Sequence, residues 1–225
     1  MIELQVNRYI VLVLTFCGLA VFAQQNDARL WLKAGVEKKL NRKLNLQIDA
    51  CTRVGENMSR LESYYVAVGL EYKVFKKLKL GAALRHSGKR EISPYYDERN
   101  RISLWLAYKR KIYKNWGLAY RPMYQQQYTN MLTSEDGYIP SKYLRNKVSV
   151  YYDLHKKYTP YITCELFYQS KYFKGEFNRV RYETGIDYEF NRKHKINVFY
   201  MLQREFNEPN PIRSYIIGLG YKFVL

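Results

Sequence analysis

The chain is poor in cysteine, histidine, proline and acidic residues. Its three Cys are too few for a disulfide-built scaffold, and six Pro with 12 Gly exclude collagen-like and low-complexity sequences. Twenty Asp and Glu stand against 38 Lys and Arg, so the formal net charge is +18. Because 47% of the 225 residues are hydrophobic, this charge does not belong to a disordered basic tail. The length fits one ordered domain.

Long hydrophobic runs are confined to the first segment. Residues 9–23 read YIVLVLTFCGLAVFA without a charge, follow Arg8 and end at Ala23 in small residues of the kind that a signal peptidase reads. This run suits a secretory leader and is shorter than the roughly 20 residues of a spanning helix. We therefore expect residues 1–23 to be a cleaved signal peptide, with an uncleaved anchor as the alternative, and residues 24–225 to form the mature domain.

The dominant pattern beyond the leader is strict alternation of apolar and polar residues. Between residues 101 and 109, for example, Ile102 and Leu104 fall on one face of an extended strand, whereas Arg101 and Ser103 fall on the other. Such a period of two predicts strands with one apolar face. Segments of this kind lie at 28–37, 44–54, 62–74, 78–87, 98–109, 116–128, 143–154, 160–170, 178–190, 195–206 and 213–225.

The length and ends of these segments favour a membrane barrel. Most reach the 9–11 residues of a tilted membrane strand, whereas soluble strands are commonly about 5–6 residues long. After Ala23 no apolar run suits a spanning helix, and the other structure that satisfies its backbone in lipid is a closed barrel. The 24 Tyr cluster toward segment ends, as in an aromatic girdle. The last five residues, 221–225, resemble the C-terminal signal that the barrel-assembly machinery of outer membranes reads.

We therefore predict an all-β fold, an antiparallel up-and-down transmembrane β-barrel of 10–12 strands after a cleaved signal peptide. The predicted location is the outer membrane of a Gram-negative bacterium, in contact with outer-membrane lipids and lipopolysaccharide. Short basic connections alternate with generally longer ones, as expected for periplasmic turns and external loops. A soluble, lipocalin-like barrel, with its apolar face inward, is the alternative.

The number of segments is odd, whereas bacterial single-chain barrels have even numbers of strands. Because the last strand must run toward the periplasm, eleven segments would make the first strand begin at the external side of the membrane. Either one segment is miscounted, or the first eight or so residues of the mature chain thread the lumen. Pro122 lies within a predicted strand and lacks a ladder donor, so we also expect a β-bulge there.

Several short motifs are shared with one group of barrels. They are Trp31, Leu70–Lys73, Glu98–Arg101, Tyr143–Lys147, Arg179–Tyr182 with Gly185 and Tyr188, and Gly218–Tyr221. With these motifs the chain resembles the uncharacterised outer-membrane barrels grouped as domain of unknown function 2490 (DUF2490). The resemblance spans essentially the mature chain and implies the fold and the location. That family has no agreed activity, so the resemblance implies no mechanism.

With the apolar face toward lipid, the inward face is rich in charge. The predicted luminal basic cluster consists of Arg53, Arg85, Arg99, Arg101, Arg121, Arg145, Lys147, Arg179 and Arg181. The predicted acidic partners at mid-depth are Asp49, Glu165 and Glu183, and Glu37, Glu71, Asp153, Asp187 and Glu189 lie toward the periplasm. The lumen is thus expected to carry cations in its external half and carboxylates toward the periplasm.

Two interpretations of this lumen stay open. Buried charges must be paired, so the side chains could form an ion-pair network that plugs a narrow barrel. Alternatively, low-dielectric walls could focus the field of the cations into a vestibule that attracts anions. The first interpretation suits a role in envelope maintenance, and the second suits passage of small solutes or anions.

Catalysis has little support in the sequence, and we assign no catalytic residue. His86 is the rim candidate, since alternation directs it toward lipid near the external end, where an acylase or phospholipase would work. A Ser–His unit needs both side chains within hydrogen-bond reach, but Ser63, Ser87 and Ser103 point inward. Contact of His86 with lipopolysaccharide is the preferred interpretation, and a lipid-modifying enzyme is the alternative.

Other ligand classes are not expected. Cys51 and Cys164 form no CxxC pattern and the three His are scattered, so the sequence predicts neither a metal site nor a cofactor. Alternation places Cys51 inside and Cys164 on the lipid face, which predicts two free thiols. A basic, aromatic-rich chain is also typical of nucleic-acid binding. The predicted secretion and the charge spread over every segment argue against such a partner.

Overall fold

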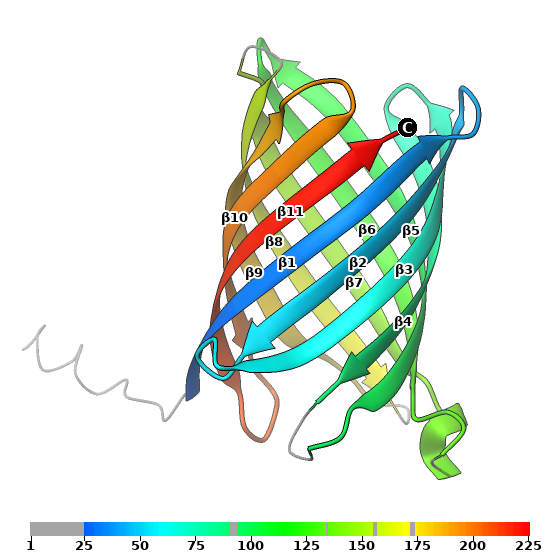
Figure 1. Cartoon of the computed structure of the whole chain (residues 1–225), viewed down its shortest axis with the longest axis vertical. Helices are drawn as coiled ribbons and strands as arrows, with labels where there is room; N and C mark the ends of the chain where they lie inside the picture. Colours follow the sequence, from blue (N-terminus) through cyan, green and yellow to red (C-terminus); the bar gives the residue numbers. More distant parts are fainter. Residues whose placement is uncertain (1–24, 91–93, 134, 155–156, 172–173) are drawn as a thin grey trace, which may run out of the picture.

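The computed structural model describes residues 25–90, 94–133, 135–154, 157–171 and 174–225. The predicted signal peptide lies outside these residues. Within them, eleven strands form one closed barrel, with a single turn of 3-10 helix, η1, at Glu135–Tyr138 (Figure 1). The strands are β1 Gln25–Lys39, β2 Leu44–Gly55, β3 Arg60–Phe75, β4 Leu78–Lys89, β5 Asp97–Tyr113, β6 Trp116–Thr129, β7 Ser141–Tyr152, β8 Tyr158–Lys171, β9 Lys174–Glu189, β10 His194–Glu205 and β11 Ile212–Val224.

The barrel closes through parallel pairing of its first and last strands. Consecutive strands pair antiparallel, whereas β1 and β11 run side by side in the same direction, from Gln25 opposite Ile212 to Glu37 opposite Val224 (Figure 1). The count of eleven segments is therefore confirmed, and the expected even number is wrong. Residues from Gln25 onward lie in the wall and do not thread the lumen. A parallel ladder, although slanted, still pairs the backbone groups of both strands.

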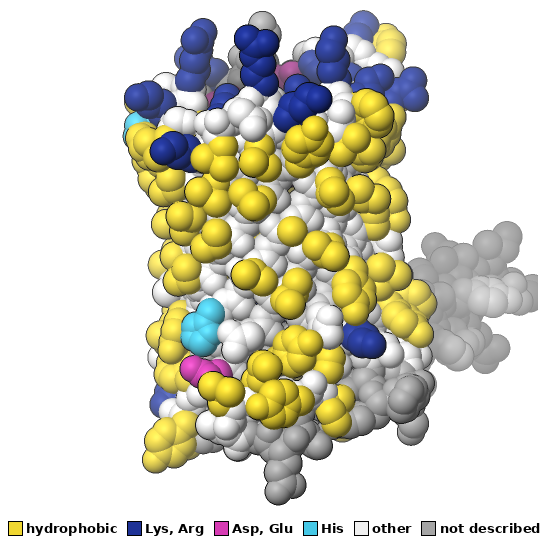
Figure 2. Space-filling view, turned by 90° about the vertical axis from the view of Figure 1, so that its right-hand side faces the viewer, with side chains coloured by type: hydrophobic (Ala, Val, Ile, Leu, Met, Phe, Trp, Pro, Cys, Tyr) yellow, Lys and Arg dark blue, Asp and Glu magenta, His cyan; other side chains and the backbone are white. Residues whose placement is uncertain are grey.

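The two ends of the barrel differ in their connections. One end, here called the turn end, carries the connections 40–43, 76–77, 114–115, 153–157 and 190–193 and the end of β11. Its opposite, the loop end, carries connections that include 90–96 and 130–140 and the start of β1. Figure 2 shows Lys and Arg side chains gathered at the turn end, above a wide band of hydrophobic side chains.

The outer surface of the wall is apolar, and the inner surface is polar. Val66, Leu84 and Ile162 are 52%, 63% and 68% exposed, whereas the polar side chains of Ser103 and Thr163 point inward and are buried. A lipocalin-like barrel requires the opposite arrangement, so that alternative is wrong. Within the described residues, no helix is long and apolar enough to cross a membrane.

Pro122 does not create a bulge. Between β5 and β6 the paired positions stop at Trp105–Met123 and resume at Tyr108–Tyr120 in the same register. The ladder therefore skips the positions around the proline, which cannot donate a hydrogen bond, without an inserted residue. The irregularity of this strand pair lies instead next to the turn, between Lys111 and Tyr113.

The two described cysteines confirm the assignment of faces. Cys51 on β2 is buried on the inner side of the wall, and Cys164 on β8 is exposed on the outer side. Both are free thiols, as predicted.

A small apolar cluster covers the inner side of the β1–β11 seam. Ile216 on β11 is fully buried and packs with Trp31 from β1 and Met201 from β10. Phe199 from β10 packs against them, with its ring edge-on to Trp31 at 6.4 Å between centroids. The tip of the Phe199 ring lies over Gly218, where a larger residue would displace it. These four side chains, the seam cluster, bury apolar surface where the sheet closes.

We expect Gly218→Ala to destabilise the barrel, because an added Cβ would overlap the Phe199 ring and disturb the seam cluster. Overpacking of this kind costs about 1–3 kcal/mol. The measurement is urea unfolding in lipid vesicles, followed by tryptophan fluorescence. Gly220→Ala is the matched control, since the nearest atom to its added Cβ, on Asn197, lies at 3.5 Å. Equal stability of the two variants would contradict this packing.

Candidate binding lumen

Two adjoining cavities occupy the barrel interior. The loop-end cavity has a volume of about 320 Å³, and the turn-end cavity one of about 570 Å³. Both are lined by Lys33, Lys147, Glu183 and Phe199, which mark their boundary at mid-depth. These volumes fall within the range of small-molecule sites, roughly 300–1,000 Å³.

The loop-end cavity has a large excess of positive charge. Eleven Lys and Arg side chains of the described residues line it, against four Glu. The cations are Arg29, Lys33, Arg53, Arg85, Lys89, Arg99, Arg101, Arg145, Lys147, Arg179 and Arg181, and the carboxylates are Glu62, Glu165, Glu183 and Glu205.

Most of the predicted luminal residues meet in this cavity. Of the nine predicted cations only Arg121 lines neither cavity, although it lies on the same face of β6 as Gln125. Glu165 and Glu183 also line the loop-end cavity, whereas Asp49 lines the turn-end cavity. Five further residues that line the cavity were not among those predicted from the sequence: Arg29, Lys33, Lys89, Glu62 and Glu205. The alternation that includes Trp31 would have found Arg29 and Lys33.

Six of these cations pair with carboxylates of the described residues. Glu165, only 5% exposed, pairs with Arg145 at 2.6 Å and with Arg181 at 3.7 Å. Both guanidinium groups also lie over the Phe167 ring, at 4.5 and 4.7 Å from its centroid. The remaining pairs are Arg179–Glu205 at 2.9 Å, Arg29–Asp27 at 2.5 Å with Glu62 at 3.0 Å, Lys147–Glu183 at 3.7 Å and Lys33–Asp49 at 3.1 Å.

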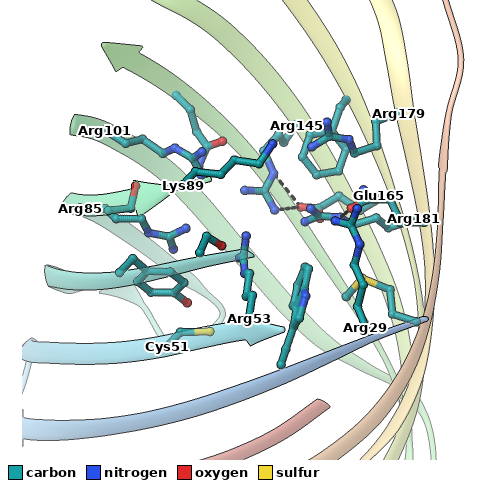
Figure 3. Close-up of a pocket in the computed structure, with 18 of the residues that line it drawn as sticks. Arg29, Cys51, Arg53, Arg85, Lys89, Arg101, Arg145, Glu165, Arg179 and Arg181 are labelled. Atoms are coloured by element: carbon teal, nitrogen blue, oxygen red, sulfur yellow. Dashed lines mark hydrogen bonds and ion pairs between the residues drawn. The ribbon is translucent and has the colours of Figure 1, made fainter. Parts of the chain in front are cut away.

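Within the described residues, a second group of arginines is held by groups other than carboxylates. The Arg53 guanidinium lies 4.0 Å from the Trp31 ring centroid, and that of Arg85 lies 3.8 Å from the centroid of Tyr65. Arg101 donates to the side-chain carbonyl of Gln127 through Nε at 3.1 Å and through Nη2. Figure 3 shows Arg85 and Arg101 on the opposite side of the cavity from Glu165, with Arg53 between them; these three side chains are here called the three-arginine cluster.

The turn-end cavity does not have the excess of carboxylates that was predicted for the periplasmic half of the lumen. Its carboxylates, such as Glu37 and Asp187, are not in excess, since five acidic and five Lys side chains of the described residues line it. The Lys pair locally with the predicted acids, for example Lys195–Glu189 at 2.6 Å and Lys222–Glu37 at 3.6 Å. Lys33–Asp49 at 3.1 Å lies at the boundary. The prediction of carboxylates alone in the lower lumen is therefore wrong, because it overlooked these inward lysines.

The outward histidine has polar neighbours but no hydroxyl among them. His86 Nδ1 lies 2.9 Å from Asn100 Oδ1, and its Nε2 lies 4.0 Å from Glu98 Oε1. Among the described residues, His86 forms no hydrogen bond with a Ser hydroxyl, which a Ser–His unit would need. No group of three or more metal-ligating side chains occurs in the described part of the chain.

A family model described as "Protein of unknown function (DUF2490)" matches residues 28–213, from β1 to the start of β11. The chain belongs to this family. The DUF2490 barrel is also similar in structure to the beta domain of the Bordetella autotransporter Brka, with a TM-score of 0.55 and 11% identity, over 76% of this chain and 78% of that chain. At this identity the likeness shows the barrel fold alone.

A second solved structure is the translocator domain of the autotransporter NalP from Neisseria meningitidis. It matches the DUF2490 barrel with a TM-score of 0.37 and 11% identity, over 77% of this chain and 71% of that chain. No curated protein sequence matches the chain.

We expect Glu165→Gln to destabilise the DUF2490 barrel strongly, because it leaves Arg145 and Arg181 buried without their shared carboxylate. Breaking a buried pair costs about 3–5 kcal/mol. Glu189→Gln, which breaks a pair whose side chains are nearly half exposed, should cost at most about 1 kcal/mol. Urea midpoints in lipid vesicles measure both. A Glu165→Gln variant as stable as the control would show that the network contributes no stability.

Proposed function

We propose that the protein lies in the bacterial outer membrane, collects small anions in the loop-end half of its lumen and passes them toward the periplasm. One observation carries this proposal: eleven cationic side chains against four carboxylates line the loop-end cavity. Low-dielectric walls focus the field of like charges and raise the local concentration of counter-ions. Small anions are therefore the solutes that this lumen should attract.

The proposal orients the loop end to the outside of the cell. Outer-membrane barrels have short periplasmic turns and longer external loops, and the two ends of this barrel differ in that way. The assembly machinery would read β11, the apolar band would contact lipid, and His86 would lie near lipopolysaccharide. The Lys and Arg of the turns would meet anionic head groups, worth about 1 kcal/mol each near the surface.

A closed, structural lumen is the competing function. The pairs Lys33–Asp49 and Lys147–Glu183 lie at the boundary between the cavities and could close it. The protein would then serve in envelope maintenance as an ion-paired plug. Ion pairing alone does not explain the loop-end excess, since only part of that charge is neutralised by carboxylates. This excess favours the anion-collecting role.

Planar-bilayer recording tests passage. Under a gradient of potassium chloride, we expect the reversal potential of the refolded protein to shift from zero toward the equilibrium potential of chloride. The preference should weaken as salt rises, because the Debye length falls from about 10 Å at 0.1 M to 3 Å at 1 M. Lys195→Gln, in the balanced turn-end cavity, should retain the preference. A closed lumen, or a conductance without anion preference, would contradict the proposed passage.

Cell fractionation tests the location. We expect the protein in the outer-membrane fraction and, because a closed barrel resists unfolding by detergent at room temperature, a gel mobility that changes after heating. Leu84→Arg, on the outer face, should lower the folded fraction, since Lys or Arg facing lipid costs about 2–4 kcal/mol at the bilayer midplane. Recovery of the parent in a soluble fraction would contradict the location.

A further inference from the structure

The three-arginine cluster concentrates like charge at one place in the wall. Arg85 on β4 and Arg101 on β5 are direct partners in the antiparallel register and point to the same side. Like charges directly opposite each other destabilise a sheet. Arg53 on β2 enters the same cavity, and Figure 3 shows the three side chains directed into it. A carboxylate or a bound anion would offset this repulsion.

The surrounding strands supply few carboxylates that are not already paired: Glu62 of β3, between β2 and β4, lines the same cavity but pairs with Arg29 at 3.0 Å. Neither β4 nor β6 contains an acidic residue. Asp49 of β2 pairs with Lys33 at mid-depth, and Asp97 of β5 accepts a hydrogen bond from Asn130 at the loop end. Glu98 lies on the outer side, near His86. The charge of the cluster is thus not neutralised by the acids of its own strands.

The contacts of the cluster leave hydrogen-bond donors available. The guanidinium groups of Arg53 and Arg85 lie over the rings of Trp31 and Tyr65, contacts that engage the flat face of an arginine. Among the described residues, neither Arg53 nor Arg85 forms a side-chain hydrogen bond or ion pair, and the buried Nε of Arg53 lacks a partner. Arg101 is bound by the neutral amide of Gln127. Arg53 and Arg85 therefore keep the N–H edges that recognise oxyanions in a fork geometry, whereas Arg101 uses its Nε–Nη2 edge for Gln127 and has only its remaining N–H groups to offer.

We propose that Arg53, Arg85 and Arg101 form a binding site for a small multivalent oxyanion, a polyphosphate or polycarboxylate, within the loop-end cavity. Three guanidinium groups match a ligand with several negative charges, and a cavity of about 320 Å³ admits only a small one. The nearby faces of Trp31 and Tyr65 are occupied by arginines, so the site offers the ligand charge and not ring stacking. This inference rests on the proposed anion-collecting lumen and names its substrate class.

The test is block of the chloride current of the full refolded protein by pyrophosphate or citrate, added at the loop end, with acetate at equal ionic strength as the monovalent reference. We expect one of the two multivalent anions to block at concentrations at least tenfold below acetate. Block by pyrophosphate alone assigns the site to phosphates, and block by citrate alone to polycarboxylates. Arg85→Gln or Arg101→Gln should weaken the block about tenfold, as expected for loss of one charged hydrogen bond.

Arg179→Gln is the matched control. It removes one positive charge from the same cavity, but from a residue that pairs with Glu205, so the block should change less than threefold. Equal weakening by all three variants would attribute the block to net charge and overturn the site. Chloride preference without multivalent block would also overturn it and leave the proposed function standing.

If the lumen is closed, passage of anions and the binding site must be tested separately. A closed lumen would contradict passage, and calorimetry of the detergent-solubilised protein would then decide on the site. Pyrophosphate or citrate binding that Arg85→Gln weakens and Arg179→Gln retains would support the three-arginine cluster without passage. Absence of binding to the folded parent would overturn it.

Discussion

Parallel pairing of β1 with β11 is the contact on which the rest of the structure depends. In lipid every backbone donor and acceptor needs a partner within the protein, so a sheet must close. Eleven strands linked by reversing connections bring the first and last strands together in the same direction. Closure also fixes the register, and the register decides which side chains face inward. The apolar outer surface and the charged lumen are two consequences of this arrangement.

A closed barrel of this size crowds its inward side chains, and the barrel stabilises their charge in two ways. Glu165 neutralises arginines from β7 and β9, which is the expected treatment of buried charge. In the same cavity, aromatic rings and an amide support Arg53, Arg85 and Arg101 instead. Cation–π contacts position a guanidinium without neutralising it. The field of the loop-end cavity therefore stays positive, although the turn-end cavity is balanced.

Period-two alternation was enough to predict the strands, their faces and most luminal cations, because a strand directs alternate side chains to opposite sides. It correctly separated Cys51 from Cys164. It could not predict how the barrel closes, since pairing of β1 with β11 depends on residues nearly 190 positions apart. Nor could it tell which luminal arginines are neutralised, because partners such as Glu165 and Arg181 come from different strands. The lower lumen was misjudged for a simpler reason: inward lysines such as Lys222 were not counted.

The central claim is that the loop-end lumen holds positive charge that its own carboxylates do not neutralise. The most direct test is anomalous diffraction from crystals soaked in bromide, which locates bound anions without any assumption about conductance. We predict bromide sites inside the loop-end cavity, at the guanidinium groups of Arg53, Arg85 and Arg101. Bromide confined to the exposed lysines of the turn end, with none in the lumen, would contradict the claim.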